Sequence, residues 1–91
     1  MDRSTFEAAL ARDGFTMVSI TMKPNAVNPE HAHSFDARVM VFGGGITIVR
    51  DGKAETFCAG DSYPVPAGTL HAEQAGPEGV AYLAGRRTAV G

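Results

Sequence analysis

Cysteine and tryptophan are almost absent from this 91-residue sequence, which has one cysteine and no tryptophan. Because Cys58 stands alone, no internal disulfide framework can hold the chain together. Such cysteine usage is typical of a reducing compartment. The first residues also lack the apolar stretch of a signal peptide, so we expect a cytoplasmic protein.

Charge of one sign and long hydrophobic runs are also missing. Eight lysines and arginines face ten acidic residues, a formal net charge of −2. Such a chain carries no basic field that would attract nucleic acid or an anionic membrane, and Arg86-Arg87 is expected to be a surface or dimer-contact pair. The uncharged run Val39–Val49 contains three glycines and is much shorter than the roughly 20 residues of a membrane helix. We therefore expect neither nucleic acid nor membrane as a partner.

The length predicts one domain with a thin hydrophobic core. We expect an N-terminal helix in residues 1–14 and a β-barrel in residues 15–91. Because small barrels often cover their exposed edges with a second copy, a homodimer is the expected assembly.

One short helix is predicted at the start of the chain. Ser4 and Glu7 have the spacing of a capping box, which satisfies free amides at a helix entrance. Phe6 and Leu10 then fall on one face, and Gly14 is a suitable terminator.

The apolar pattern changes to a period of two after Gly14. Val18, Ile20 and Met22 alternate with polar residues, which predicts a half-buried strand. Asp51-Gly52 favours a tight hairpin. Further strands are expected at 38–42, 46–50, 53–58, 62–65, 71–74 and 80–83. This series predicts an all-β fold, an antiparallel barrel or jelly roll.

All three histidines lie in two short segments. His31 and His33 flank Ala32, so on an extended strand both rings point to one face. Two ring nitrogens can then reach one ion at about 2.0–2.1 Å. His71 can add a third ligand only if its strand is a neighbour of the first.

Two spaced sets of residues surround these histidines. The first consists of Asn25, His31, His33, Arg38 and Gly45, and the second of Gly60, Pro66, Gly68, His71 and Ala75. They resemble the two cupin motifs, G-x5-H-x-H-x3,4-E-x6-G and G-x5-P-x-G-x2-H-x3-N, with seven of the ten specified residues in agreement. The resemblance is strongest to small single-domain cupins, and it implies an antiparallel barrel with a metal near its mouth.

Three residues depart from these motifs. Asn25 replaces a glycine, a mild change because asparagine tolerates left-handed backbone. Ala75 replaces the asparagine, and Arg38 stands where the family has a glutamate ligand. Arginine cannot ligate a cation. Arg38 would therefore either bind an anionic group of the substrate or pair with Asp36.

Two acidic residues are expected beside the metal site, and two apolar ones in the substrate pocket. By strand parity Asp36 shares a face with Arg38, and Glu73 shares a face with His71. Both are predicted to support the ligands by hydrogen bonding, and either one could replace the missing glutamate. Met40 and Phe42 have the parity of Arg38 and are expected to line the substrate pocket with it.

The sequence thus predicts a metal centre built from His31, His33 and His71. One divalent transition metal is expected, and iron, zinc, manganese, nickel or copper would suit imidazole-rich ligands. The resemblance implies a metal-dependent enzyme, dioxygenase-like or an isomerase or lyase, acting on a small polar or anionic molecule. The alternative is a non-catalytic barrel or sensor module that binds a small ligand. No catalytic acid or base is assigned.

Overall fold

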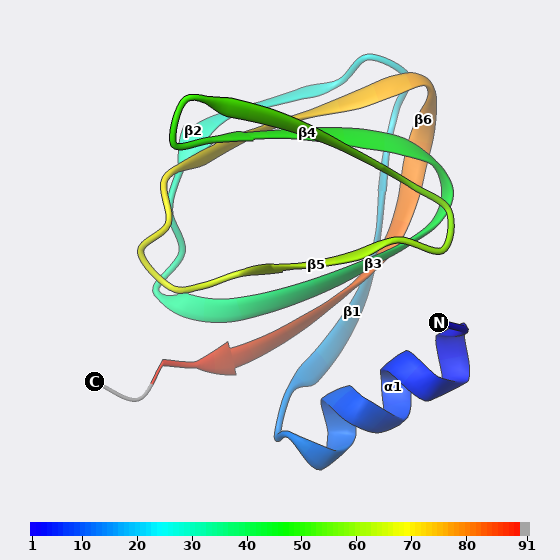
Figure 1. The fold of residues 1–91 in the computed structure, drawn as a ribbon, viewed down its shortest axis with the longest axis vertical. Helices are drawn as coiled ribbons and strands as arrows, with labels where there is room; N and C mark the ends of the chain where they lie inside the picture. Colours follow the sequence, from blue (N-terminus) through cyan, green and yellow to red (C-terminus); the bar gives the residue numbers. More distant parts are fainter. Residues whose placement is uncertain (90–91) are drawn as a thin grey trace.

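Two long antiparallel strands organise the fold. β3 (Phe35–Arg50) and β6 (His71–Thr88) pair with each other along most of their length. In the computed structural model, which describes residues 1–89, both strands curve around the molecule and belong to two layers (Figure 1). The last two residues of the expected barrel segment 15–91 lie outside the described residues.

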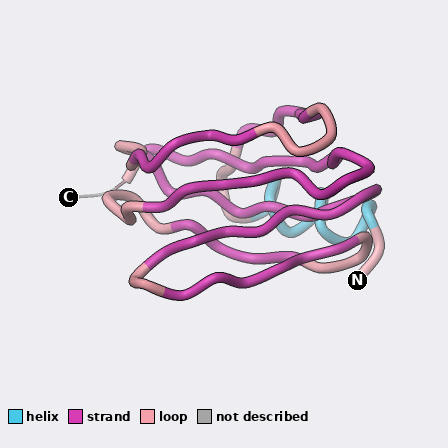
Figure 2. The backbone as a smooth tube through the Cα atoms, turned by 90° about the horizontal axis from the view of Figure 1, so that it is seen from above, coloured by secondary structure: helices cyan, strands magenta, loops and turns pink. Residues whose placement is uncertain are grey.

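Four shorter strands complete the two layers. β1 (Thr16–Met22) pairs with the C-terminal half of β6, and β5 (Ser62–Val65) pairs with the N-terminal half of β3. In the other layer, β2 (Val27–His31) pairs with the start of β6 and β4 (Lys53–Cys58) with the end of β3. The two layers face each other as the halves of a barrel (Figures 1 and 2). The expected all-β antiparallel barrel with one short N-terminal helix is confirmed.

Glycines allow the long strands to bend where the sequence predicted interruptions. The segments 43–45 and 76–79 were expected to separate strands, yet pairing continues through both with shifts of register. Gly44 has a φ of +68° and Gly79 a φ of +76°. A Cβ at Gly44 would collide with the carbonyl oxygen of Gly79. The glycines therefore bring the two bends into close contact without ending either strand.

The N-cap of helix α1 (Arg3–Arg12) lies two residues before the predicted cap. Asp2 is the N-cap, and its side chain accepts a 2.8 Å hydrogen bond from the amide of Thr5. The capping box predicted at Ser4 and Glu7 is therefore wrong, because Asp2 is the residue whose side chain accepts from a free amide of the first turn.

The apolar face of α1 is as predicted. Phe6 and Leu10 are buried against the outside of the barrel, with Phe15, Met40 and Leu83 in the same cluster. Gly14, with a φ of +79°, follows the helix and turns the chain into β1. No helix in residues 1–89 has the length and apolar character needed to cross a membrane.

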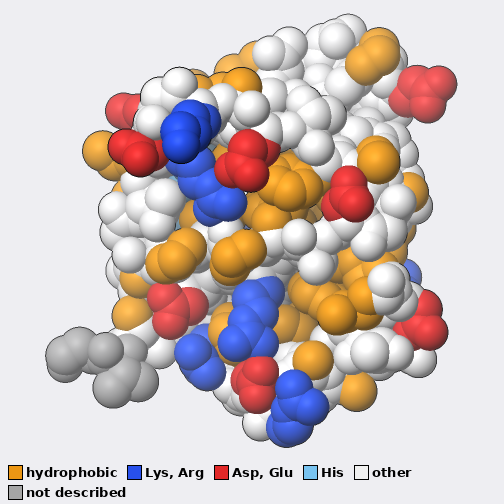
Figure 3. Space-filling model, in the orientation of Figure 1, with side chains coloured by type: hydrophobic (Ala, Val, Ile, Leu, Met, Phe, Trp, Pro, Cys, Tyr) orange, Lys and Arg blue, Asp and Glu red, His pale blue; other side chains and the backbone are white. Residues whose placement is uncertain are grey.

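A second, larger core fills the interior of the barrel. Its buried side chains are supplied by both layers and include Val39, Val41, Ile46, Ile48, Val65 and Tyr82. Ile20 and Met22 of β1 pack against this core, in agreement with the predicted alternation, whereas Val18, predicted on the same face, is exposed. On the face seen in Figure 3, acidic and basic side chains are interspersed rather than gathered by sign.

Candidate metal centre

Strand pairing brings the histidines together. His31 ends β2 and is the register partner of His71, which begins β6. His33 follows two residues later, and its carbonyl oxygen accepts a 2.9 Å hydrogen bond from the amide of Gly68. The turn that precedes His71 thus holds the segment that carries His33. The two strands are neighbours, which was the condition for His71 to join the other two histidines.

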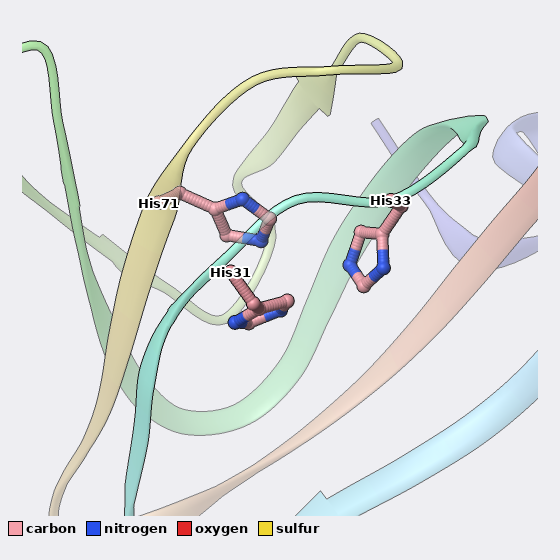
Figure 4. A group of neighbouring side chains, drawn as sticks. All are labelled: His31, His33 and His71. Carbon is pink, nitrogen blue, oxygen red and sulfur yellow. The ribbon is translucent and has the colours of Figure 1, made fainter.

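The three rings point toward one another (Figure 4). Their centroids are 4.4 Å apart for His31 and His71, 4.8 Å for His31 and His33, and 5.2 Å for His33 and His71. One ring nitrogen from each lies within 4.8 Å of the others. Ligand atoms around a tetrahedral ion are about 3.3 Å apart, given metal–nitrogen bonds of about 2.0–2.1 Å. Small rotations of the side chains would close that difference.

Backbone carbonyls fix the orientation of two of the rings. Nδ1 of His31 lies 2.7 Å from the oxygen of Pro29, and Nδ1 of His71 lies 2.9 Å from the oxygen of Thr69. A carbonyl oxygen only accepts, so each Nδ1 carries the proton and donates it. In the neutral ring this leaves the lone pair on Nε2, the arrangement found in metal-ligating histidines. The residues present fit a metal ion.

His33 is kept neutral by its surroundings. Burial is the first cause that lowers its pKa below the ordinary value of 6.5, and the nearby His31 and His71 lower it further. Its ring also stacks on Phe35, with centroids 4.6 Å apart. A neutral imidazole offers a lone pair, whereas a protonated one cannot bind a cation.

The histidines lie in the wall of a cavity of about 190 Å³ at one end of the barrel. That volume accommodates several water molecules or a small organic molecule. Apolar walls surround a few polar groups. Besides the histidines, the lining residues are Ile20, Asn28, Phe35, Ala37, Val39, Val65, Glu73, Tyr82, Ala84 and Arg86.

Glu73 is the one acidic residue among residues 1–89 that lines this cavity. Its Oε1 accepts a 3.1 Å hydrogen bond from Nδ2 of Asn28 and lies 4.0 Å from Nε2 of His31. The side chain is 11% exposed. A carboxylate is thus held near Nε2 of His31, the ring nitrogen not used by the Pro29 carbonyl.

Asp36, the other acidic residue predicted at the site, lies elsewhere. Its Oδ1 accepts a hydrogen bond from the amide of Ala67, and its Oδ2 is 3.7 Å from Nη2 of Arg87. It does not line the histidine cavity. Of the two acidic residues, the structure brings only Glu73 to the histidines.

Arg38, Met40 and Phe42 also lie away from the predicted pocket. Arg38 donates a 2.6 Å hydrogen bond to Asp13, while Met40 and Phe42 pack in the cluster under α1. They share one face of β3, as parity predicted, but it is the outer face.

The residue of β3 that faces the histidines is Ala37, in line with Phe35 and Val39. The family motif allows three or four residues between its second histidine and its glutamate. With four intervening residues the glutamate position falls at Arg38, whereas with three it falls at Ala37. Because side chains alternate along a strand, that single residue decides the face. An alanine has no ligand atom, so β3 supplies no carboxylate to the cavity.

Arg86, Tyr82 and Asn28 line the cavity but were not predicted to. Tyr82, Ala84 and Arg86 alternate along β6, so the period of two could have indicated Arg86 once Tyr82 was placed inside. Burial is the first cause that raises the pKa of Tyr82, to about 12, and the nearby Glu73 adds to it. The phenol is therefore neutral near pH 7 and able to donate a hydrogen bond.

Comparison with known proteins identifies the family. Residues 18–84 match the family model described as a cupin domain, and the chain belongs to the cupin family. No curated protein matches the sequence significantly.

Solved structures share the fold. An RmlC-like cupin from Shewanella frigidimarina is 27% identical, with 82% of this chain and 67% of that chain covered and a TM-score of 0.73. A cupin 2 conserved barrel domain protein from Salinispora arenicola is 26% identical, with coverages of 79% and 61% and a TM-score of 0.68. KdgF from Halomonas sp. is 24% identical, with coverages of 80% and 69% and a TM-score of 0.68, a likeness of fold alone.

Proposed function

We propose that this cupin is a metal-dependent enzyme that acts on a small anionic molecule, by dioxygenase-like or by isomerase or lyase chemistry. The observation that supports it most directly is the pair of carbonyl contacts at His31 and His71. They leave Nε2 of each ring as the nitrogen available to an ion beside His33, in a cavity large enough for a small ligand.

The donor set suits a catalytic ion better than a structural one. Three neutral nitrogens leave one or more coordination positions open, because Ala37 provides no fourth ligand from β3. When bound, a divalent ion supplies Lewis acidity to an oxygen of the substrate or of water. Iron, zinc, manganese, nickel and copper all accept imidazole, so the ion is to be identified by measurement.

Two other polar groups of the cavity, Glu73 and Tyr82, can accept and donate protons. Glu73 is held by Asn28 through Oε1, which leaves Oε2 free to accept a proton from the substrate. Tyr82 supplies a neutral hydroxyl that donates to an oxygen of the bound molecule. The apolar side chains of Ile20, Val39 and Val65 restrict water around them.

A non-catalytic ligand-binding barrel is the second candidate. It is favoured by the missing carboxylate at Ala37 and by the mostly apolar lining of the cavity. Such a barrel would hold the same ligand through the same histidines without converting it.

The two candidates differ in product formation. Protein loaded separately with each of the five metals is incubated with a panel of small hydroxy and keto acids, with and without dioxygen, and followed by oxygen consumption and NMR. The enzyme forms product with at least one metal, and His71→Ala abolishes turnover while the circular dichroism spectrum is unchanged. Arg38→Gln, on the outer face, serves as the active control. Ligand-induced NMR shifts without product under every metal would support the binding barrel instead.

A further inference from the structure

Arg86, which lines the cavity, differs from the other arginines in its partners. The five other arginines each have a carboxylate within 4.0 Å among the described residues: Arg3–Glu7, Arg12–Asp13, Arg38–Asp13, Arg50–Glu55 and Arg87–Asp36. Arg86 has no such partner in residues 1–89, and its contact is Phe35, whose ring centroid lies 5.2 Å from the guanidinium carbon. The cavity therefore has a cation whose hydrogen-bonding capacity is not used by a carboxylate of residues 1–89.

We propose that Arg86 binds a carboxylate of the ligand and so makes the site selective for small organic acids with a second oxygen that reaches the histidines. This inference rests on the proposed function, because the second oxygen is assigned to the metal. It names Arg86 as the residue that determines specificity, in place of Arg38.

The position of Arg86 on β6 fits this role. It follows Tyr82 and Ala84 on the inward face, and all three line the cavity. Its positive charge lies close enough to lower the pKa of His33 and to oppose the rise in the pKa of Tyr82. Phe35 contacts both the guanidinium and the ring of His33, so the same aromatic ring packs against the cation and against one candidate metal ligand.

Charge and shape both favour a carboxylate. The planar guanidinium presents two parallel N–H groups that match the two oxygens of a carboxylate. Arg86 is exposed at the mouth of the cavity, and Phe35 packs against one side of its guanidinium. With a dication bound to the histidines, Glu73 offsets only part of the positive charge in the cavity. Anionic molecules are therefore favoured over neutral ones.

A ligand that contacts both Arg86 and the histidines needs two polar groups, because both sites lie in the wall of one cavity. One oxygen would lie among the histidines and a carboxylate on Arg86. A four-carbon dicarboxylate has this bifunctional character, and its diamide has nearly the same shape without charge. Succinate and succinamide are therefore the matched probes.

Arg87 provides the control within the same strand. It is adjacent to Arg86 but points to the other face, where its Nη1 donates to the carbonyl of Asp13 and its Nη2 faces Asp36. Arg87→Gln removes the same charge from nearly the same place in the sequence without changing the cavity wall.

The test is calorimetric titration of the zinc-loaded wild type, Arg86→Gln, Arg86→Lys and Arg87→Gln with succinate and with succinamide. Zinc content and the circular dichroism spectrum are measured on each protein first. Loss of a charge-assisted pair should weaken succinate binding by about tenfold to a hundredfold in Arg86→Gln. Arg86→Lys should lie between, Arg87→Gln should match the wild type, and succinamide affinity should be the same in all four.

The outcomes separate the two proposals. Full zinc content with equal succinate affinity in the wild type and Arg86→Gln would overturn the role of Arg86 alone. An equal loss in Arg87→Gln, or no succinate binding by the zinc-loaded wild type, would overturn it as well. A wild type that retains no zinc would contradict the proposed function and with it this inference.

Discussion

Arg38 donates a 2.6 Å hydrogen bond from Nη1 to Oδ2 of Asp13, which lies 25 residues earlier in the chain. Asp13 caps the C-terminus of α1, so the contact joins the end of the helix to the outer face of β3. The guanidinium groups of Arg38 and Arg87 also each lie 4.5 Å from the ring centroid of Phe15. Arg38 therefore anchors the helix and is not available to the histidine cavity.

This ion pair predicts how stability depends on pH. The hydrogen bond from Arg38 is the first cause that lowers the pKa of Asp13 below 3.8 in the folded protein. The stabilisation is then fully present above the unfolded pKa of Asp13 and is lost as the pH falls through the lower folded value. Asp13→Asn lacks this contribution at every pH.

Urea denaturation of both proteins between pH 3 and pH 7 checks this. The wild type should have the higher midpoint at neutral pH, and the difference should shrink below about pH 4. A difference that stays constant down to pH 3 would contradict the assignment.

Replacing Ala37 by glutamate is expected to raise the affinity for metal. Because Ala37 faces the histidines, Ala37→Glu should add a carboxylate ligand and tighten metal binding about tenfold, equivalent to about 1.4 kcal/mol. Arg38→Glu is the control, since it introduces the same carboxylate one residue later on the outer face. Competition with a chelator of known affinity measures both. Tighter binding in Arg38→Glu but not in Ala37→Glu would contradict the orientation of β3.

Replacing Gly44 by alanine is expected to cause a large loss of stability. An alanine there would have an unfavourable φ and a Cβ colliding with the backbone of Gly79, so Gly44→Ala should cost at least about 3 kcal/mol. Gly52 has a similar φ of +71° with no atom within 4 Å of an added Cβ, so Gly52→Ala should cost only about 1 kcal/mol. Urea midpoints compare the two. Equal losses would show that the contact between the strand bends is unimportant.

Leu10 tests whether the helix is part of the cooperative fold. Leu10 is fully buried against the barrel and lies over Gly85, so Leu10→Ala should destabilise the protein by about 2–5 kcal/mol. Leu70 is 59% exposed, and Leu70→Ala should change stability by less than about 0.5 kcal/mol. If Leu10→Ala has the smaller effect, α1 does not pack on the barrel as described.

The strands near turns of clear chemistry were predictable from local sequence. Lys53–Cys58 and Ser62–Val65 have the boundaries expected from Asp51-Gly52 and from the turn that follows Cys58. Asn25 has the left-handed backbone that its substitution for glycine predicted, with a φ of +61°. These features depend on a few neighbouring residues, which is why the sequence was sufficient.

Other features depended on partners distant in sequence. Gly43–45 and Gly76–79 resemble turns, but the pairing of β3 with β6 carries both strands through them. The cluster of three histidines was indicated by their spacing. The inward position of Ala37 and Arg86 was not, because parity along a strand gives two faces and only the closed barrel distinguishes them.

Metal content tests the central claim most directly. Protein purified without an affinity tag or chelator is analysed for iron, zinc, manganese, nickel and copper, beside the His31→Ala/His71→Ala double variant and Cys58→Ser. Cys58 is exposed, and its substitution controls for adventitious thiol binding. The account predicts about one ion per chain in the wild type and in Cys58→Ser, and none in the double variant. No metal in the wild type, together with no rebinding of any of the five ions, would contradict it.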